Sequence, residues 1–202
     1  QKVLEKFSFP LMSPEIQQSA KSAIINYLYR NEYRDIDTAL NIKSTFAVSD
    51  EIFASPEIQN AAKEIMATRL SVEKSYKWIE GAREIQEKFI LSPDNVHYAA
   101  KKGMENCLSN GVVDNALEIR DKFSVPVDFV STPEIQNAAK AGMIKCLLKV
   151  EIGNAVKIRD QFPIPSEFFL SPEIQKAAKG AIVNHVSGAS YIDSNYFNRI
   201  NE

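Results

Sequence analysis

The stretch "SPEIQNAAK" at residues 55–63 recurs along the chain, as "TPEIQNAAK" at 132–140 and "SPEIQKAAK" at 171–179. Two more divergent copies, "SPEIQQSAK" at 13–21 and "SPDNVHYAAK" at 92–101, bring the number to five. Their starts are 42, 37, 40 and 39 residues apart. A period in this range is typical of helical repeats, in which each unit buries its apolar face only by stacking on its neighbours.

Each copy begins with residues that favour the start of a helix. Ser or Thr can cap the helix with its hydroxyl, Pro suits the first helical position, and an acidic residue usually follows near the positive end of the helix dipole. Apolar residues then recur every four positions, as at Ile135, Ala139, Met143 and Leu147 of the fourth copy. This spacing predicts an amphipathic helix of about four turns, here called helix A.

A second pattern follows each of the first four copies and has the frame Ala, three residues on to Ile, four more to Phe. It reads "ALNIKSTF" at 39–46, "AREIQEKF" at 82–89, "ALEIRDKF" at 116–123 and "AVKIRDQF" at 155–162. These residues share one helical face, so the frame predicts a second helix, here called helix B. The sequence therefore predicts an all-α fold, an α-solenoid of about four and a half helix-turn-helix repeats with a period near 39–40 residues.

We expect a single repeat domain over 1–202. Its predicted parts are a partial repeat at 1–12, repeats at 13–54, 55–91, 92–131 and 132–170, and a partial or capping repeat at 171–202. Because residue 1 falls inside a repeat and the Ala–Ile–Phe frame is missing after the last helix A, the chain reads as a segment of a longer array. An array with irregular caps is the alternative.

This helix-turn-helix pattern resembles the tetratricopeptide-like α-solenoid superfamily at the level of the fold. The period is longer than the 34 residues or so of that repeat, and the Trp, Leu-Gly and Tyr set of its first helix is absent. The closest feature is the framing of helix B from Ala to Phe. The resemblance implies a protein-binding scaffold and carries over no ligand-binding residues.

Composition narrows the functional classes. Lys and Arg total 24 against 26 for Asp and Glu, and this balance argues against a dedicated nucleic-acid binder. No apolar run is long enough to span a bilayer, so no membrane association is expected. Two cysteines and no signal-peptide pattern favour a reducing, cytoplasmic location.

The titratable residues do not form a catalytic or metal-binding motif. His97 and His185 have no partner at metal-ligand spacing, and Cys107 and Cys146 occupy equivalent positions one repeat apart, which indicates packing. We therefore expect no enzymatic activity, no cofactor, no metal and no small-molecule substrate.

The lysine that ends each motif copy is the first candidate binding feature. This lysine column comprises Lys21, Lys63, Lys101, Lys140 and Lys179. Stacked repeats would align these side chains about 10 Å apart, where they could hold an acidic peptide or a phosphate backbone. Alternatively, each lysine covers apolar surface and faces acidic residues of the next unit, which is the interpretation we favour.

The second candidate is a position in helix A that differs in every repeat. This variable column comprises Tyr27, Arg69, Cys107, Cys146 and His185. Such variation could encode specificity on a uniform scaffold, or it could mark a tolerant, half-buried edge position. The function predicted from the sequence is a non-enzymatic scaffold that recruits a protein or peptide along successive A helices. The alternatives are single-stranded RNA binding by one unit per repeat, and a structural spacer.

Overall fold

The structure is a computed structural model that describes residues 13–30, 35–71 and 76–187. Within these ranges it contains eleven α-helices, one 3-10 helix and no strand, which confirms the predicted all-α class. The partial repeat predicted at 1–12 and the end of the last one, after residue 187, lie outside the described residues.

The long helices alternate between the predicted A and B types. The A helices are α2 (Pro14–Arg30), α5 (Pro56–Leu70), α7 (Pro93–Ser109), α10 (Pro133–Leu148) and α12 (Pro172–Val186). The B helices are α3 (Asp35–Thr45), α6 (Tyr76–Lys88), α8 (Val113–Lys122) and α11 (Ile152–Gln161). Every A helix begins at the proline of its motif copy, as predicted.

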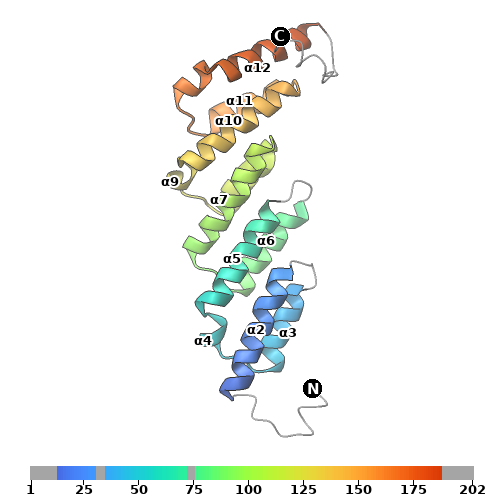
Figure 1. Cartoon of the computed structure of the whole chain (residues 1–202), viewed down its shortest axis with the longest axis vertical. Helices are drawn as coiled ribbons and strands as arrows, with labels where there is room; N and C mark the ends of the chain where they lie inside the picture. Colours follow the sequence, from blue (N-terminus) through green and yellow to red (C-terminus); the bar gives the residue numbers. More distant parts are fainter. Residues whose placement is uncertain (1–12, 31–34, 72–75, 188–202) are drawn as a thin grey trace. The chain divides into compact units, whose positions relative to one another are not determined.

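The chain separates into two compact units. The first combines Gln1–Leu70 with Lys74–Ala99, and the second combines Ser71–Glu73 with Ala100–Glu202. In the first unit α2 packs against α3 and α5, and α5 packs against α6 (Figure 1). In the second unit α10 packs against α11 and α12. The single domain over 1–202 stays a prediction.

The predicted apolar faces form the core. In α10 the stripe of Ile135, Ala139, Met143 and Leu147 is buried, and its equivalents in α5 are buried as well. The Ala and Ile of the helix B frame are buried in α6, α8 and α11. The Phe that follows each of these helices is buried as well, at Phe89, Phe123 and Phe162. Helix pairing is thus driven by burial of the two stripes on each other.

Three of the four motif serines cap their A helices. The hydroxyl oxygen accepts the backbone N–H three residues on from Ser13 (3.4 Å), Ser92 (3.3 Å) and Ser171 (3.5 Å). The prediction is wrong for Ser55, whose hydroxyl makes no cap bond to a backbone N–H, and for Thr132, which makes no side-chain cap. The Thr132 hydroxyl instead donates to the carbonyl of Phe129 at 3.2 Å, in the preceding short helix.

Three B helices end in the same turn. The residue after the terminal Phe is left-handed at Ala47 (φ 46°), Ile90 (φ 50°) and Ser124 (φ 47°). The next N–H then bonds to the carbonyl five residues back, at 2.9 Å from Val48, 3.1 Å from Leu91 and 3.0 Å from Val125. This is a Schellman motif built without glycine. Pro163 occupies the same place after α11, where the proline ring forbids positive φ, and the chain leaves Phe162 extended.

In the first two repeats the glutamine of the motif joins helix A to helix B. The side-chain amide of Gln17 donates to the carbonyl of Phe46 at 3.0 Å, and that of Gln59 donates to the carbonyl of Phe89 at 2.9 Å. Each bond satisfies a carbonyl at the end of helix B, which would otherwise lack an intrahelical partner.

The shortest repeat lacks a short helix that the other repeats carry after helix B. The segments that follow α3, α8 and α11 contain α4 (Asp50–Phe53), α9 (Val127–Val130) and the 3-10 helix η1 (Ser166–Leu170). Between α6 and α7 no such helix occurs, because Leu91 is followed at once by the next motif. That repeat is the one whose period is 37 residues.

Two A helices approach each other closely at Gly142 in α10. A Cβ atom there would lie 1.9 Å from the carbonyl oxygen of Leu108 in the preceding A helix. Real Cβ atoms do not come within 3.0 Å of such an atom, so only glycine fits between these backbones.

Candidate functional site

Three lysines of the column contact the acidic residue at the start of the next A helix. Three Nζ–carboxylate pairs repeat this geometry: Lys21–Glu57 at 2.9 Å, Lys101–Glu134 at 3.0 Å and Lys140–Glu173 at 3.2 Å. In each pair the glutamate is the third residue of the following motif copy. The favoured interpretation, that these lysines face acidic residues of the next unit, is confirmed for these three.

The pKa values of Glu57 and Glu134 reflect this contact. The hydrogen bond from Lys21 is the main cause that lowers the pKa of Glu57. For Glu134, a backbone N–H at the helix start is the largest cause of a lowered pKa, and the Lys101 hydrogen bond comes next. The lysine charges are therefore already compensated between repeats, which leaves less for an external anion.

Two lysines of the column differ from the rest. Lys63 donates to the Asn60 side-chain oxygen at 3.1 Å, and its Nζ lies 4.5 Å from the centre of the Tyr98 ring in the next A helix. Lys179 in α12 is exposed and has no ion pair within the part of the chain that the structure describes.

The variable column divides into core and surface residues. Arg69, Cys107 and Cys146 are each only 1% exposed. Tyr27 is half-buried with the Arg30 guanidinium 4.8 Å from its ring centre, and His185 is exposed. Three of the five side chains thus lie away from solvent, and contact of this column with a ligand stays a prediction.

The buried Arg69 of the variable column fits because its neighbours leave space for its side chain. The Arg69 guanidinium lies 5.7 Å from the Trp78 ring centre, and a Cβ on Gly81 would come within 2.8 Å of Arg69 Nη1. Gly81 thus leaves room for the arginine, where the other B helices carry Thr or Asn. Burial raises the pKa of the Cys146 thiol to about 11, which makes it a poor nucleophile near neutral pH.

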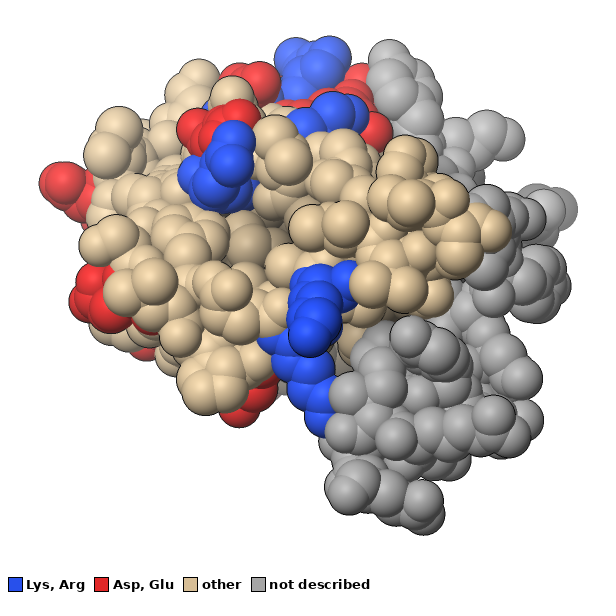
Figure 2. All heavy atoms as spheres, turned by 90° about the horizontal axis from the view of Figure 1, so that it is seen from above, with Lys and Arg blue, Asp and Glu red and all other residues tan. Residues whose placement is uncertain are grey.

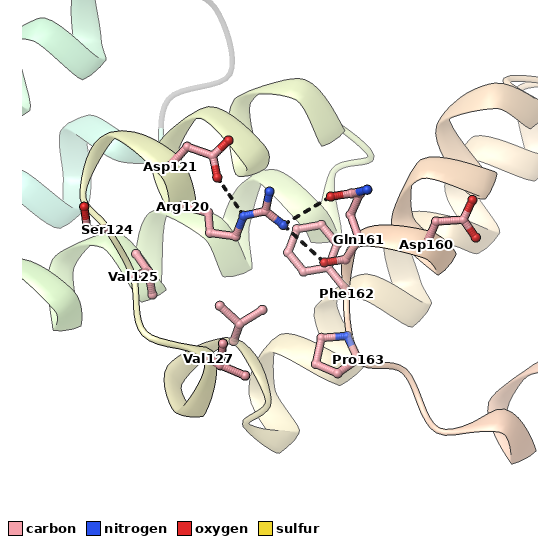
Figure 3. Close-up of a pocket in the computed structure, with 10 residues that line it drawn as sticks. Arg120, Asp121, Ser124, Val125, Val127, Asp160, Gln161, Phe162 and Pro163 are labelled. Atoms are coloured by element: carbon pink, nitrogen blue, oxygen red, sulfur yellow. Dashed lines mark hydrogen bonds and ion pairs between the residues drawn. The ribbon is translucent and has the colours of Figure 1, made fainter.

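A pocket of about 670 Å³, here called the Val127 pocket, opens beside the ends of α8 and α11. It is lined by Arg120, Asp121, Ser124, Val125, Val127, Val130, Asp160, Gln161, Phe162 and Pro163. Figure 3 shows Arg120 between Asp121 and Gln161, with the valines on the opposite wall.

Arg120 connects the two helices that border the Val127 pocket. Its Nε donates to Asp121 at 2.8 Å, while Nη1 donates to the backbone and side-chain oxygens of Gln161 at 3.3 and 3.4 Å. Because a guanidinium is planar and holds several donors in fixed directions, these bonds fix the polar wall opposite the apolar one.

A second pocket, of about 570 Å³, lies in the first unit and is here called the Ile90 pocket. It is lined by Lys43, Asp50, Phe53, Ala54, Pro56, Gln59, Phe89, Ile90, Ser92 and Asn95. Its apolar floor is the stacked pair Phe53 and Phe89, whose ring centres are 5.2 Å apart. Lys43 pairs with Asp50 at 2.9 Å and lies 4.0 Å from the centre of the Phe53 ring.

The two pockets are built from equivalent positions of different repeats. Lys43 and Arg120 both stand three residues before the terminal Phe of helix B, and Phe89 and Phe162 are themselves that terminal Phe. Further equivalent pairs are Asp50 with Val127, Phe53 with Val130, and Ile90 with Pro163. The two pockets therefore share a basic residue and an apolar floor at equivalent positions, whereas their acidic residues stand at different positions, Asp50 in one pocket and Asp121 and Asp160 in the other.

Each pocket carries an exposed apolar side chain. Ile90 is 79% exposed and Val127 is 76% exposed, and Leu170 in the closing loop of the next repeat is 76% exposed. Ile90 is also β-branched in a left-handed conformation, which costs free energy. Exposed apolar groups around a concave surface are typical of binding sites.

The sequence pattern does not reveal these pockets. Their linings come from loops and helix ends separated by some 40 residues, and no periodic stripe marks them. The one available signal was the basic residue three places before the Phe, in "IKSTF" and "IRDKF". No group of three His, Cys, Asp or Glu side chains suited to a metal ion occurs in the described ranges.

None of the described helices is long and apolar enough to cross a bilayer. Comparison of the chain with protein-family models, with curated proteins and with solved structures finds no match.

Proposed function

We propose that the chain is a non-enzymatic α-solenoid scaffold that binds extended protein segments through the Val127 and Ile90 pockets. The observation that carries this proposal is the recurrence of one pocket at equivalent positions of two repeats. Both pockets place a basic residue, Lys43 or Arg120, and the terminal Phe of a B helix at equivalent positions, and acidic residues stand nearby in each. This recurrence supports a site that is used repeatedly along a repeat array.

The chemistry of the pockets indicates the kind of ligand. An apolar floor of Phe and Val suits a large aliphatic or aromatic side chain, and the polar wall can accept or donate hydrogen bonds to the backbone that carries it. This proposal moves the binding surface from the A helices to the ends of the B helices and the loops that follow them.

RNA binding has less support from the same structure. A phosphate backbone would need the lysine column, and three of its five members already pair with glutamates of the next repeat. A structural spacer without a ligand remains as an outcome of the test.

The test is selection from a random peptide library displayed on phage, with the chain immobilised and native. We expect enriched peptides that share a large apolar residue. The variants Val127→Lys and Ile90→Lys should each weaken binding to the affected pocket by about tenfold, since a buried apolar contact is replaced by a charge. Ile182→Lys is the matched control, because Ile182 is 58% exposed and lies outside both pockets.

Enrichment of peptides whose binding is insensitive to both pocket variants would place the site elsewhere. A selection that yields no binder would favour the spacer.

A further inference from the structure

A row of hydrogen bonds holds the side-chain amide of Asn110, which lies in the turn after α7. Its nitrogen donates to the backbone and side-chain oxygens of Asn106, at 3.1 and 3.2 Å. Asn106 is itself fixed, because its own amide donates to the carbonyl of Ser71. On the other side, Lys145 Nζ of α10 donates to the Asn110 side-chain oxygen at 2.9 Å. The Asn110 amide is therefore held between α7 and α10.

Asn110 is also the only asparagine in the sequence that is followed by glycine. In this pair the backbone nitrogen of the glycine can attack the asparagine side chain, since no Cβ blocks its approach. The Gly111 nitrogen gives its proton to hydroxide and forms a bond to Asn110 Cγ. The Cγ–Nδ2 bond then breaks, Nδ2 takes a proton from water and leaves as ammonia, and a cyclic imide remains. Water opens the imide at either carbonyl, which gives aspartate or, with the backbone rerouted through Cγ, isoaspartate.

The native turn holds both reacting groups in other contacts. The Gly111 N–H donates to the carbonyl of Leu108 at 2.8 Å. Gly111 is left-handed at φ 76°, and a Cβ there would lie 3.1 Å from Cys146 Sγ, so α10 packs directly on the turn. For the reaction to occur, Gly111 must release its hydrogen bond and the Asn110 amide must leave its partners.

We propose that Asn110–Gly111 is a site of spontaneous deamidation that the native contact between α7 and α10 holds in check, with Lys145 as the residue that restrains the Asn110 amide. The reaction then proceeds only through openings in which α10 moves off the turn. The amount of product therefore records how often this junction between repeats opens. The site is independent of the two binding pockets proposed above.

The products would weaken the junction that protects the asparagine. A carboxylate at position 110 still accepts from Lys145, but it cannot donate to the two oxygens of Asn106. Isoaspartate also adds a methylene group to the backbone of the turn, where the hydrogen bond from Gly111 to Leu108 depends on the native spacing. Because the loss of ammonia is irreversible in water, opening and modification reinforce each other.

The test measures the deamidation rate of the full native chain at mildly alkaline pH, with a synthetic peptide of residues 108–114 as the unfolded reference. The product gains one carboxylate, so ion exchange separates it from the parent, whose formal net charge is -2. On the face shown in Figure 2 the Lys and Arg side chains occupy a few separate places among uncharged residues, which favours separation by one added charge. Peptide mapping by mass spectrometry then locates the change at Asn110.

We expect the native chain to react at least about tenfold more slowly than the peptide, because an opening step precedes the chemistry. Lys145→Met removes the hydrogen bond to the Asn110 oxygen and keeps a long side chain, so the native rate should rise by about tenfold. Lys149→Met is the matched control, because Lys149 is exposed and follows the last residue of α10, and this change should leave the rate unaltered. In concentrated urea the parent and both variants should react at the rate of the peptide in the same urea.

A native chain that reacts as fast as the peptide overturns the proposal. So does a Lys145→Met variant that reacts at the parent rate or more slowly, because the lysine would then not restrain the amide or would activate it. Circular dichroism shows whether this variant keeps the helical content of the parent. If it does not, the parent chain supplies the same test: urea below the unfolding transition should accelerate its reaction, and a rate that stays as constant as that of the peptide contradicts control by opening.

Discussion

Substitution of Gly142 by alanine should destabilise the second unit, although alanine is the better helix former. The carbonyl oxygen of Leu108 lies 1.9 Å from the place of the new Cβ, and ordinary contact begins near 3.4 Å. One backbone must therefore move by about 1.5 Å relative to the other, and two packed helices cannot do this without loss of neighbouring contacts.

The magnitude follows from two opposing terms. Replacing glycine by alanine inside a helix stabilises by about 1 kcal/mol through helix propensity. Overpacking of a tight contact typically costs about 1–3 kcal/mol, and a backbone clash lies at or above the upper end because no side chain can rotate away. We expect a net loss of about 2 kcal/mol or more.

Gly180→Ala in α12 is the matched control, because a Cβ there would meet nothing within 4 Å. It should stabilise by about 0.5–1 kcal/mol. The assay is urea unfolding of both variants, followed by far-UV circular dichroism. If Gly142→Ala raised the unfolding midpoint as Gly180→Ala does, the close approach of α7 and α10 would be refuted.

Further predictions concern the turns, the buried thiol and the acidic side of the pH range. Val150 is a β-branched residue with a left-handed backbone at φ 62°, so Val150→Gly should raise the thermal midpoint of unfolding. Gly111 occupies the same turn of the preceding repeat at φ 76°, so Gly111→Val should lower that midpoint. The pKa of Cys146 is raised from 9.0 to about 11, so the native state keeps its proton while the unfolded state loses it. Stability should therefore fall from about pH 9 to pH 11, and Cys146→Ser should flatten that slope in urea titrations. The lowered pKa values of Glu57 and Glu134 give stability that is present above about pH 4.5 and is lost on acidification, and Glu57→Gln should reduce this loss.

The sequence predicted those parts of the fold that depend on local periodicity. The proline of each motif marks the first residue of every A helix, and the stripe of Ile135, Ala139, Met143 and Leu147 is buried as expected. These features follow from helix geometry and the burial of apolar surface, and both can be read within one repeat.

The ends of the helices were harder to predict. Positive φ at Ala47, Ile90 and Ser124 has no glycine to announce it, because packing of the following residue and the hydrogen bonds of the turn outweigh the local strain. The cap predicted at Thr132 failed because its hydroxyl bonds to α9, an element that the sequence pattern had not revealed.

The candidate site depends on contacts between repeats, which a single sequence does not contain. The variable column suggested a specificity surface, yet Arg69 is buried because Gly81, a dozen residues later, leaves space for it. The Val127 pocket joins residues of α8, α9 and α11, and only the tertiary packing of these helices brings Arg120 to Gln161.

Amide chemical-shift mapping by NMR, with a selected peptide titrated into the labelled chain, locates the binding site directly. If the peptide binds in the two pockets, the largest shifts cluster around Val127 and Gln161 and around Phe53 and Ile90. The exposed side of the A helices, such as Asn60 and Asn137, should remain unchanged. Shifts confined to the A helices, with no change at either pocket, would show that the pockets are not the binding site.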